Sequence, residues 1–480
     1  MAKTGTSREM EALQIFRMTL HRFQDAMDAI EDLSSFAEEH APENIKKSDT
    51  FQITIPAPTA GDLPTDRIEA ANTALINFFE RAAKTMREGS AEELEGERTD
   101  NVKASLRELA TTMFDELDSA STEEFDAGKY AVDMMYMGRN RSRLEVLRSS
   151  LLTTAVGDFE VLFSGIVGMY FFLRPEALMS KEAQFSWQEI QEFESLADLR
   201  EFHAQRQVDQ LMWKGLDDWM DWLEKRLKIS FEDIALDPDA VKEVFQRRHV
   251  IVHNGGRVSR QYLTKLPQYS AKKVEVGTAL TVSAEYLSTA LDELYSLGVL
   301  MAGSVANRLF RRPDIRSVIH GHLRSDLEAR CIKGERWKAA ARVSASYVDM
   351  FDTEAAKTAM KINYWVAKKN RDGVDAVRKE VAAWDVSSLR DEFRLARMLL
   401  LDQFEDAFPL ASSLGERGDL EANEYLHGPL YEGLRGWAES QGLKGPFSEK
   451  EQARIAEIAE IVEEGVRKDR NIHEQGELDD

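Results

Sequence analysis

The sequence predicts an all-α protein, and three observations carry this prediction. Hydrophobic side chains recur with a period near 3.6 residues along almost the whole chain, which is the spacing of one helix face. Only 11 of the 480 residues are proline, the residue that interrupts helices most strongly. No segment shows a convincing alternation of β-branched residues, which would indicate a half-buried strand.

Composition and charge describe an acidic globular protein. The chain has 62 Lys and Arg against 85 Asp and Glu, which gives a net charge of -23 at pH 7. A field of this sign repels nucleic acids at long range, so a general, sequence-independent nucleic-acid coat is excluded and any nucleic-acid work must be local. The single cysteine, Cys331, excludes an intramolecular disulfide and a multi-cysteine zinc site. Because the N-terminus also lacks a signal-peptide pattern, we expect a cytoplasmic protein.

The first 144 residues predict an N-terminal helical domain. Residues 7–40 have the pattern of one long amphipathic helix, and a proline-marked break at 51–64 is the candidate for the only short strand. Helices are expected again at about 65–87 and 101–118. A basic segment at 139–143 ends this domain.

Residues 145–312 predict a bundle of four helical segments, at 145–173, 187–228, 238–253 and 282–310. The apolar stretch 151–173 resembles a membrane span, but Asp158 and Glu160 lie inside it and its uninterrupted part covers only 161–173. A helix needs about 20 apolar residues to cross a bilayer. We therefore expect a buried helix of a soluble protein and no membrane.

The segment 313–445 predicts helical-hairpin repeats. Helix pairs are expected at about 321–350, 353–384, 387–416 and 419–441, a spacing near that of tetratricopeptide repeats. Alanines and tryptophans recur at suggestive positions, although the full repeat consensus is absent. Residues 446–480 predict a terminal helix and an acidic tail.

The helix at 238–253 carries the candidate chemistry. Asp237 and Pro238 form a strong start signal, and Asn254 with two glycines after it forms a stop signal. On a helical projection the apolar stripe has Arg248 nearest its centre, with His249 and His253 on its flank. The apolar members of the stripe are Val241, Val244, Phe245 and Val252.

An arginine beside two histidines can supply a base, an acid and a charge stabiliser, which phosphodiester chemistry needs. The alternative is a chance cluster in which cations favourably meet the carbonyl end of a helix dipole. A metal site is the weaker interpretation, because His249 and His253 lack the glutamate of H-E-x-x-H and no third ligand is evident. We therefore expect no metal and no cofactor.

The charge around this helix favours an anionic ligand. Residues 242–273 contain eight basic residues and one acidic residue, Glu243, a local charge of +7 in an acidic chain. Further basic runs lie at 139–143 and 308–316. Solvated surface charge is the alternative explanation for each run.

Residues 248–253, RHVIVH, have the form R-x4-H and resemble the signature of HEPN-domain ribonucleases. The ordered context also resembles bacterial members of that family, with TTAVGDFEVLF, then WQEIQEFESLADLR, then DWMDWLEKRLKI before the motif. The resemblance covers about residues 145–310. The helical pairs after 320 resemble the repeats appended to such domains.

The resemblance implies a four-helix bundle that forms a homodimer with two motifs facing one cleft. His253 would be the main acid and base at a ribose 2′-hydroxyl, Arg248 would bind the scissile phosphate, and His249 would assist. Asp158 or Glu160 would be the partner of Arg248. Supporting and RNA-binding positions are Asn254, Arg247, Arg257 and Arg260.

The sequence thus predicts a metal-independent endoribonuclease of the toxin or anti-phage (abortive infection) type, with RNA as substrate. The repeats would bind a regulatory protein or peptide. Two alternatives remain open: a non-catalytic HEPN-like dimerisation or nucleotide-binding module with a protein-binding repeat scaffold, and a purely structural helical adaptor.

Overall fold

The computed structural model describes residues 3–41, 65–90, 96–122, 125–131, 143–178, 185–268, 274–443 and 445–447. Across these residues the secondary structure is helical and contains no β-strand. Extended pairing in this part of the chain is limited to an isolated antiparallel bridge between Arg257 and Ala279. The all-α prediction is therefore confirmed. The candidate strand at 51–64 lies outside the described residues.

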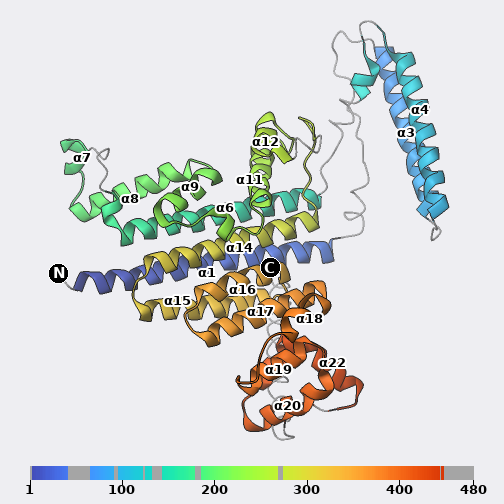
Figure 1. The fold of residues 1–480 in the computed structure, drawn as a ribbon. Coiled ribbons are helices and arrows are strands. Elements are labelled where there is room, and N and C mark those ends of the chain that lie inside the picture. The colour runs from blue at the N-terminus through green and yellow to red at the C-terminus, as the bar shows by residue number, and fades with distance from the viewer. Residues whose placement is uncertain are drawn as a thin grey trace, which may run out of the picture. The chain divides into compact units, whose positions relative to one another are not determined.

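The chain divides into two compact units, residues 36–148 and residues 1–35 with 149–480. In the smaller unit, α3 (Thr65–Ser90) and α4 (Gly96–Ala120) pack side by side (Figure 1). Their shared core includes Ala71, Leu75, Met113 and Leu117. These helices extend the expected ones by a few residues.

Three long helices form the centre of the larger unit: α1 (Lys3–His40), α6 (Arg143–Leu173) and α14 (Ala284–Leu309) (Figure 1). They meet at Phe23, whose ring lies 6.2 Å from that of Phe159 and 6.4 Å from that of Tyr295, between centroids. A Cβ at Gly298 would lie 2.4 Å from Cε1 of Phe23, so the close approach of α14 to α1 requires glycine at this position.

The other helices of this unit follow in chain order. Before α14 these are η2 (Pro175–Leu178), α7 (Trp187–Gln191), α8 (Leu196–Met212), α9 (Leu216–Leu227), α10 (Phe231–Ile234), α11 (Pro238–His253) and α12 (Arg260–Lys265). After it come α15 (Pro313–Asp326), the π-helical η3 (Leu327–Ile332), α16 (Trp337–Met350), α17 (Glu354–Asp372), α18 (Asp375–Ala382), α19 (Asp391–Leu400), α20 (Phe404–Arg417), α21 (Ala422–His427), η4 (Pro429–Tyr431) and α22 (Glu432–Ser440).

The position of α1 differs from the domain limits expected from the sequence. Its predicted apolar stripe is buried, with Leu13, Phe16, Leu20, Phe23 and Met27 in one cluster with α6 and α14. Most of α1 therefore belongs to the larger unit and completes its core. An amphipathic pattern shows that a helix has a buried face, but it does not show which partner covers that face.

The predicted helical segment 187–228 is divided into α7, α8 and α9. Ser195 is the N-cap of α8 and marks the end of the segment between α7 and α8. Its side-chain oxygen accepts hydrogen bonds from the backbone N–H groups of Ala197 and Asp198. Gly215, in an extended conformation, precedes α9. Local capping therefore replaces the expected continuous helix.

The hydrophobic core continues across residue 312, where the sequence predicted a domain boundary. Ile315, Ile319, Leu323 and Tyr347 share one hydrophobic cluster with α6 and α14, so the first helices after α14 complete the same core. The helices from α15 to α20 are 14, 14, 19, 8, 10 and 14 residues long, which does not fit a regular repeat. A separate cluster joins α19 to α22.

Among the described residues, α6 is the one helix long and apolar enough to cross a membrane. Half of its most apolar stretch is buried inside the protein. The helix packs against α1 through Phe159 and against α9 through Phe163, whose ring stacks 5.0 Å from that of Trp219. This apolar helix is thus covered in part by other helices of the same chain. The expected tail lies outside the described residues from position 448 onward.

Candidate functional site

Helix α11 has the limits expected from its end signals. The carboxylate of Asp237 accepts hydrogen bonds from the backbone of Asp239 and Ala240 at 3.1 Å, and Pro238 follows as the first helical residue. At the other end, Gly255 and Gly256 have φ angles of +59° and +76°. These glycines turn the chain sharply, which leaves the last turn of α11 at the surface.

The buried face of α11 is rotated relative to the expected one. Val241, Val244 and Phe245 are buried as predicted, but Val252 is 48% exposed and was wrongly placed in the stripe. Glu243 and Arg247 are only 2% and 9% exposed. The arginine in the core is therefore Arg247, not Arg248.

A polar network holds Arg247 in the core. Its Nε donates to Oε1 of Glu243 at 2.7 Å, and its guanidinium carbon lies 3.9 Å from the ring centroid of Tyr286. The hydroxyls of Tyr262 and Tyr286 both donate to the Glu243 carboxylate. Burial, together with the charge of Glu243, raises the pKa of Tyr286 well above its usual value, so this hydroxyl stays a donor.

This network contradicts the predicted RNA-binding role of Arg247. One guanidinium nitrogen also donates to the backbone oxygen of Thr281 at 2.5 Å. The side chain is enclosed and its donors point inward. Removing it would leave Glu243 as a buried, uncompensated charge, so Arg247 stabilises the fold rather than contacting a ligand.

Arg248 lies at the edge of the core, with its side chain 28% exposed. Its Nη2 lies 3.5 Å from Oε2 of Glu160 on α6, so the expected contact with an acidic residue of that helix is present. Its Nε is buried and makes no hydrogen bond within the described part of the chain. Burial raises the pKa of Glu160, although the charge of Arg248 opposes this shift. Arg248 thus retains unused hydrogen-bonding capacity.

Asp158 does not join this site. It lies two residues before Glu160 on α6, about 200° around the helix, and therefore points to the other side. There it faces α1, where the charge of Arg22 partly offsets the burial that raises its pKa. Of the two acidic residues considered from the sequence, Glu160 is the partner of Arg248.

His249 and His253 lie together on the last turns of α11. Their ring centroids are 4.7 Å apart and their planes are tilted by 48°. His249 is half-buried and His253 is exposed. Burial lowers the pKa of His249, and the nearby His253, Lys265 and Arg248 add to this effect. At neutral pH His249 is therefore an uncharged imidazole beside a permanent cation.

The remaining predicted residues have different surroundings. Asn254 is the exposed C-cap of α11, and its backbone N–H donates to the oxygen of Val250 at 2.9 Å. Arg257 donates from Nη1 to the backbone oxygen of Gly277 at 3.1 Å, which ties the turn after α11 to a neighbouring loop. Arg260 is exposed at the first residue of α12.

The described residues contain no cluster of three or more His, Cys, Asp or Glu side chains arranged to hold a metal ion. At the end of α11, the two histidines accordingly have no third metal ligand beside them among these residues. The described side chains of this site are a guanidinium, two imidazoles and an amide, together with one carboxylate from α6. Such a set suits an anion better than a cation.

Fold and site together define an all-α protein with a partly buried arginine, a half-buried histidine and an exposed histidine at one helix end. No family model matches the chain, and neither a curated protein nor a solved structure matches it.

The sequence reasoning missed the network around Glu243. Glu243 and Arg247 are four residues apart, a spacing that places an acid and a base on the same face of a helix. This signal was present in the sequence. Tyr262 and Tyr286 could not be found in the same way, because they reach Glu243 from other segments.

Proposed function

We propose that the protein is a metal-independent endoribonuclease, acting in the cytoplasm as a toxin or anti-phage effector. The observation that supports it most directly is the grouping of Arg248, His249 and His253 on the last turns of α11, with Glu160 beside the arginine. A cation and two imidazoles meet the needs of phosphodiester cleavage by an internal nucleophile.

In this proposal each side chain has a distinct part. His253 takes the proton from a ribose 2′-hydroxyl, and the oxygen attacks the adjacent phosphorus while the bond to the 5′-oxygen of the next nucleotide breaks. Arg248 binds the phosphate and stabilises its developing negative charge. His249, neutral because its pKa is lowered, orients the phosphate. Asn254 and Arg260 line the approach, and Arg257 supports the turn.

The proposal includes a two-fold homodimer. One α11 helix offers a single phosphate-binding arginine, and no described carboxylate orients either imidazole. A second copy facing the first would double the cations and supply an acid for the leaving oxygen. The helices after α14 would then bind the protein or peptide that regulates cleavage.

The test is cleavage of total RNA by the purified full-length protein, compared with Arg248→Ala and His253→Ala. His427→Ala is a matched control, because His427 is also an exposed histidine at the last residue of a helix. Both site variants should lose about a hundredfold or more in rate, while the control keeps the wild-type rate. Wild-type cleavage by both site variants would refute the proposal.

One observation favours a second candidate function, a module that binds RNA or nucleotides without cleaving them. Neither imidazole has an orienting carboxylate among the described residues, whereas catalytic histidines are commonly held by one. Under this alternative the protein binds labelled RNA through Arg248 but releases no fragments. The same assay separates the two functions, because only the nuclease produces new RNA ends.

A further inference from the structure

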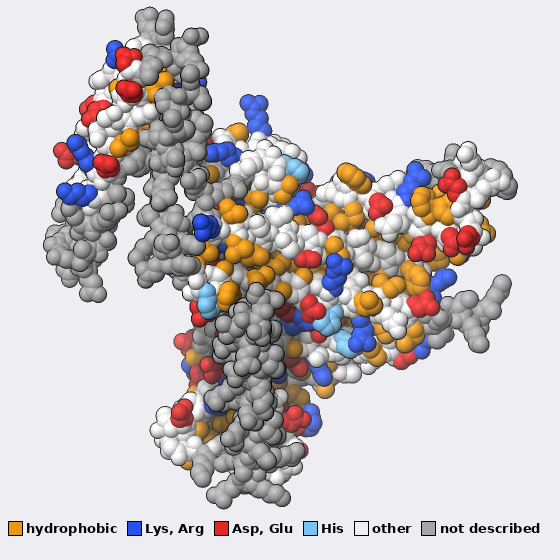
Figure 2. Space-filling model, turned by 180° about the vertical axis from the view of Figure 1, so that it is seen from behind, with side chains coloured by type: hydrophobic (Ala, Val, Ile, Leu, Met, Phe, Trp, Pro, Cys, Tyr) orange, Lys and Arg blue, Asp and Glu red, His pale blue; other side chains and the backbone are white. Residues whose placement is uncertain are grey.

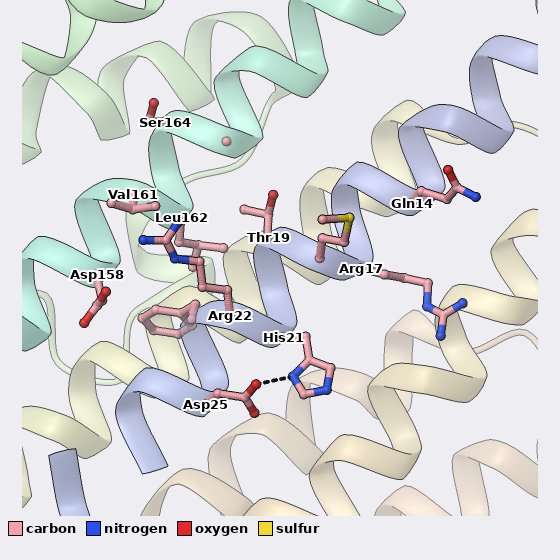
Figure 3. Close-up of a pocket in the computed structure, with 13 residues that line it drawn as sticks. Gln14, Arg17, Thr19, His21, Arg22, Asp25, Asp158, Val161, Leu162 and Ser164 are labelled. Carbon is pink, nitrogen blue, oxygen red and sulfur yellow. Dashed lines mark ion pairs between the residues drawn. The ribbon is translucent and has the colours of Figure 1, made fainter. Parts of the chain in front are cut away.

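A large groove lies between α1 and α6 in the larger unit, with a volume of about 1010 Å³. The two helices form its walls (Figure 3). At its floor, a Cβ on Gly165 would lie 2.6 Å from Cγ2 of Thr19, so glycine allows the helices to approach closely here. Figure 2, seen from the side opposite to Figure 1, shows hydrophobic side chains interspersed with both basic and acidic side chains across this face.

The α1 wall of the groove is basic. Arg17, His21 and Arg22 are exposed and line it, and Figure 3 shows Arg22 extending from α1 toward α6. Neither Arg17 nor Arg22 forms a close ion pair with another described residue, although the charge of Arg22 acts on Asp158 of α6. Two guanidinium groups with no close carboxylate among the described residues therefore lie on one wall of the groove, in a chain with a net charge of -23.

Two carboxylates also face the groove, and their partners differ. Asp25 is occupied, because it lies 2.7 Å from Nδ1 of His21 and 2.6 Å from Nη2 of Arg330. Asp158 lies opposite Arg22 on the α6 wall. Among the described residues, Arg17 has no carboxylate within ion-pair distance, so the groove retains capacity for an external anion.

The groove and the α11 site share one helix. Asp158 and Val161 face the groove, whereas Glu160 contacts Arg248 on another side of α6. Val161 is 43% exposed and lies between them. A helix with its side chains is about 10 to 12 Å wide, so a flexible polymer can cross α6 and occupy both places. Single-stranded nucleic-acid sites follow the backbone with such cationic grooves.

From this arrangement we infer that the groove between α1 and α6 binds the phosphates of a single-stranded RNA through Arg17 and Arg22, beside the segment held at α11. The exposed Met18 and Val161 offer apolar contacts for the bases. The inference rests on the proposed function for the identity of the polymer. The groove itself has no part in the cleavage chemistry.

The test measures binding separately from cleavage. A fluorescently labelled oligouridylate of about 12 nucleotides is titrated against full-length protein carrying His253→Ala, and fluorescence anisotropy is read at several salt concentrations. The groove variant adds Arg17→Glu and Arg22→Glu. The control instead adds Arg81→Glu and Arg107→Glu, which change the charge equally at exposed positions of the smaller unit.

The groove variant should bind at least about tenfold more weakly, with a salt slope smaller by about 1.4 for two lost phosphate contacts on a single strand. The control should retain its affinity. Equal losses in both variants, or no loss in the groove variant, would overturn the inference. Arg17→Gln with Arg22→Gln repeats the test without charge reversal, in case the glutamates perturb α1.

Sedimentation of the same variants tests whether a second copy of this chain, rather than RNA, occupies the groove. If the groove substitutions change the oligomeric state, the groove is an interface between copies of this chain, and the inference is wrong. The outcome is also separable from the nuclease proposal. A protein that never cleaves RNA but loses binding in the groove variant would refute the proposed function and support the groove. If the protein cleaves RNA, and neither cleavage nor binding changes when Arg17 and Arg22 are substituted, the proposed function is supported and the inference about the groove is refuted.

Discussion

Arg247 donates a hydrogen bond from Nε to Oε1 of Glu243, four residues earlier on α11, at 2.7 Å in the protein core. The next residue, Arg248, reaches the surface beside Glu160. Adjacent residues on a helix are about 100° apart, which is enough to separate a structural arginine from one that can meet a ligand.

This relationship predicts destabilising effects of very different size for two neighbouring substitutions. Arg247→Ala should lower the free energy of unfolding by about 3 to 5 kcal/mol, because it leaves a charged Glu243 buried without its partner. Arg248→Ala, at a partly exposed site with a 3.5 Å ion pair, should cost about 1 kcal/mol or less. Urea denaturation followed by circular dichroism measures both values. If Arg248→Ala lowered the free energy of unfolding more than Arg247→Ala, Arg248 and not Arg247 would be the structural arginine.

The chemistry of the proposed nuclease predicts the ends of its products. Cleavage should persist in excess chelator and should leave 2′,3′-cyclic phosphates, because the nucleophile is the RNA's own 2′-hydroxyl and not a metal-bound water. End-group analysis of RNA treated with and without chelator measures this. Fragments with 5′-phosphates, or a strict need for a divalent ion, would contradict the mechanism.

A partly buried carboxylate on α14 predicts a pH dependence of stability. Burial, together with the charges of Glu31 and Glu293, raises the pKa of Asp292 from its ordinary value of 3.8 to about 6. The folded state therefore holds this proton more tightly than the unfolded state does. Its stability contribution is complete below pH 3.8 and is lost as the pH rises through 6.

Asp292→Asn should accordingly stabilise the protein by about 3 kcal/mol at pH 8, from a difference of about two pKa units, and by less at pH 5. Asp349→Asn, at an exposed position of α16, is the control and should show no such difference between the two pH values. Thermal or urea unfolding at both pH values measures the effect. An equal gain at pH 5 and pH 8 would argue against a raised pKa.

The shared core after α14 predicts where the chain can be shortened. Ending it at residue 320 would expose the cluster that Leu323, Leu327 and Tyr347 complete, so this truncation should aggregate or unfold. Ending it at residue 390 removes α19 to α22, whose core is largely separate, and should leave a folded protein. Limited proteolysis and thermal melting compare the two. A stable, cooperatively folded chain ending at 320 would contradict this packing argument.

Assembly can be checked independently of activity. The proposed two-fold cleft requires a dimer, so sedimentation equilibrium of the full chain should give twice the mass of one chain. The Arg248→Ala variant should keep that state, because a single truncated side chain removes little contact area. A strictly monomeric protein that still cleaves RNA would exclude a cleft built from two copies.

Local rules in the sequence were sufficient for most helices. The limits of α11 followed from Asp237, Pro238 and the glycines after Asn254, because caps act through backbone groups only a few residues away. The helical period located α1, α6 and α14 to within a few residues. The same period could not divide α7, α8 and α9, since the gaps between them depend on single capping residues.

The sequence by itself determined that the chain is helical and that Arg248, His249 and His253 share the end of one helix, because helical spacing is fixed by backbone geometry. Only the tertiary structure decided that α1 completes the core, that Arg247 is buried and that Glu160, not Asp158, meets Arg248. These outcomes depend on the rotation and neighbours of each helix. Contacts between residues that are distant in the sequence determine the rotation and the neighbours of each helix. A local sequence pattern does not predict such contacts.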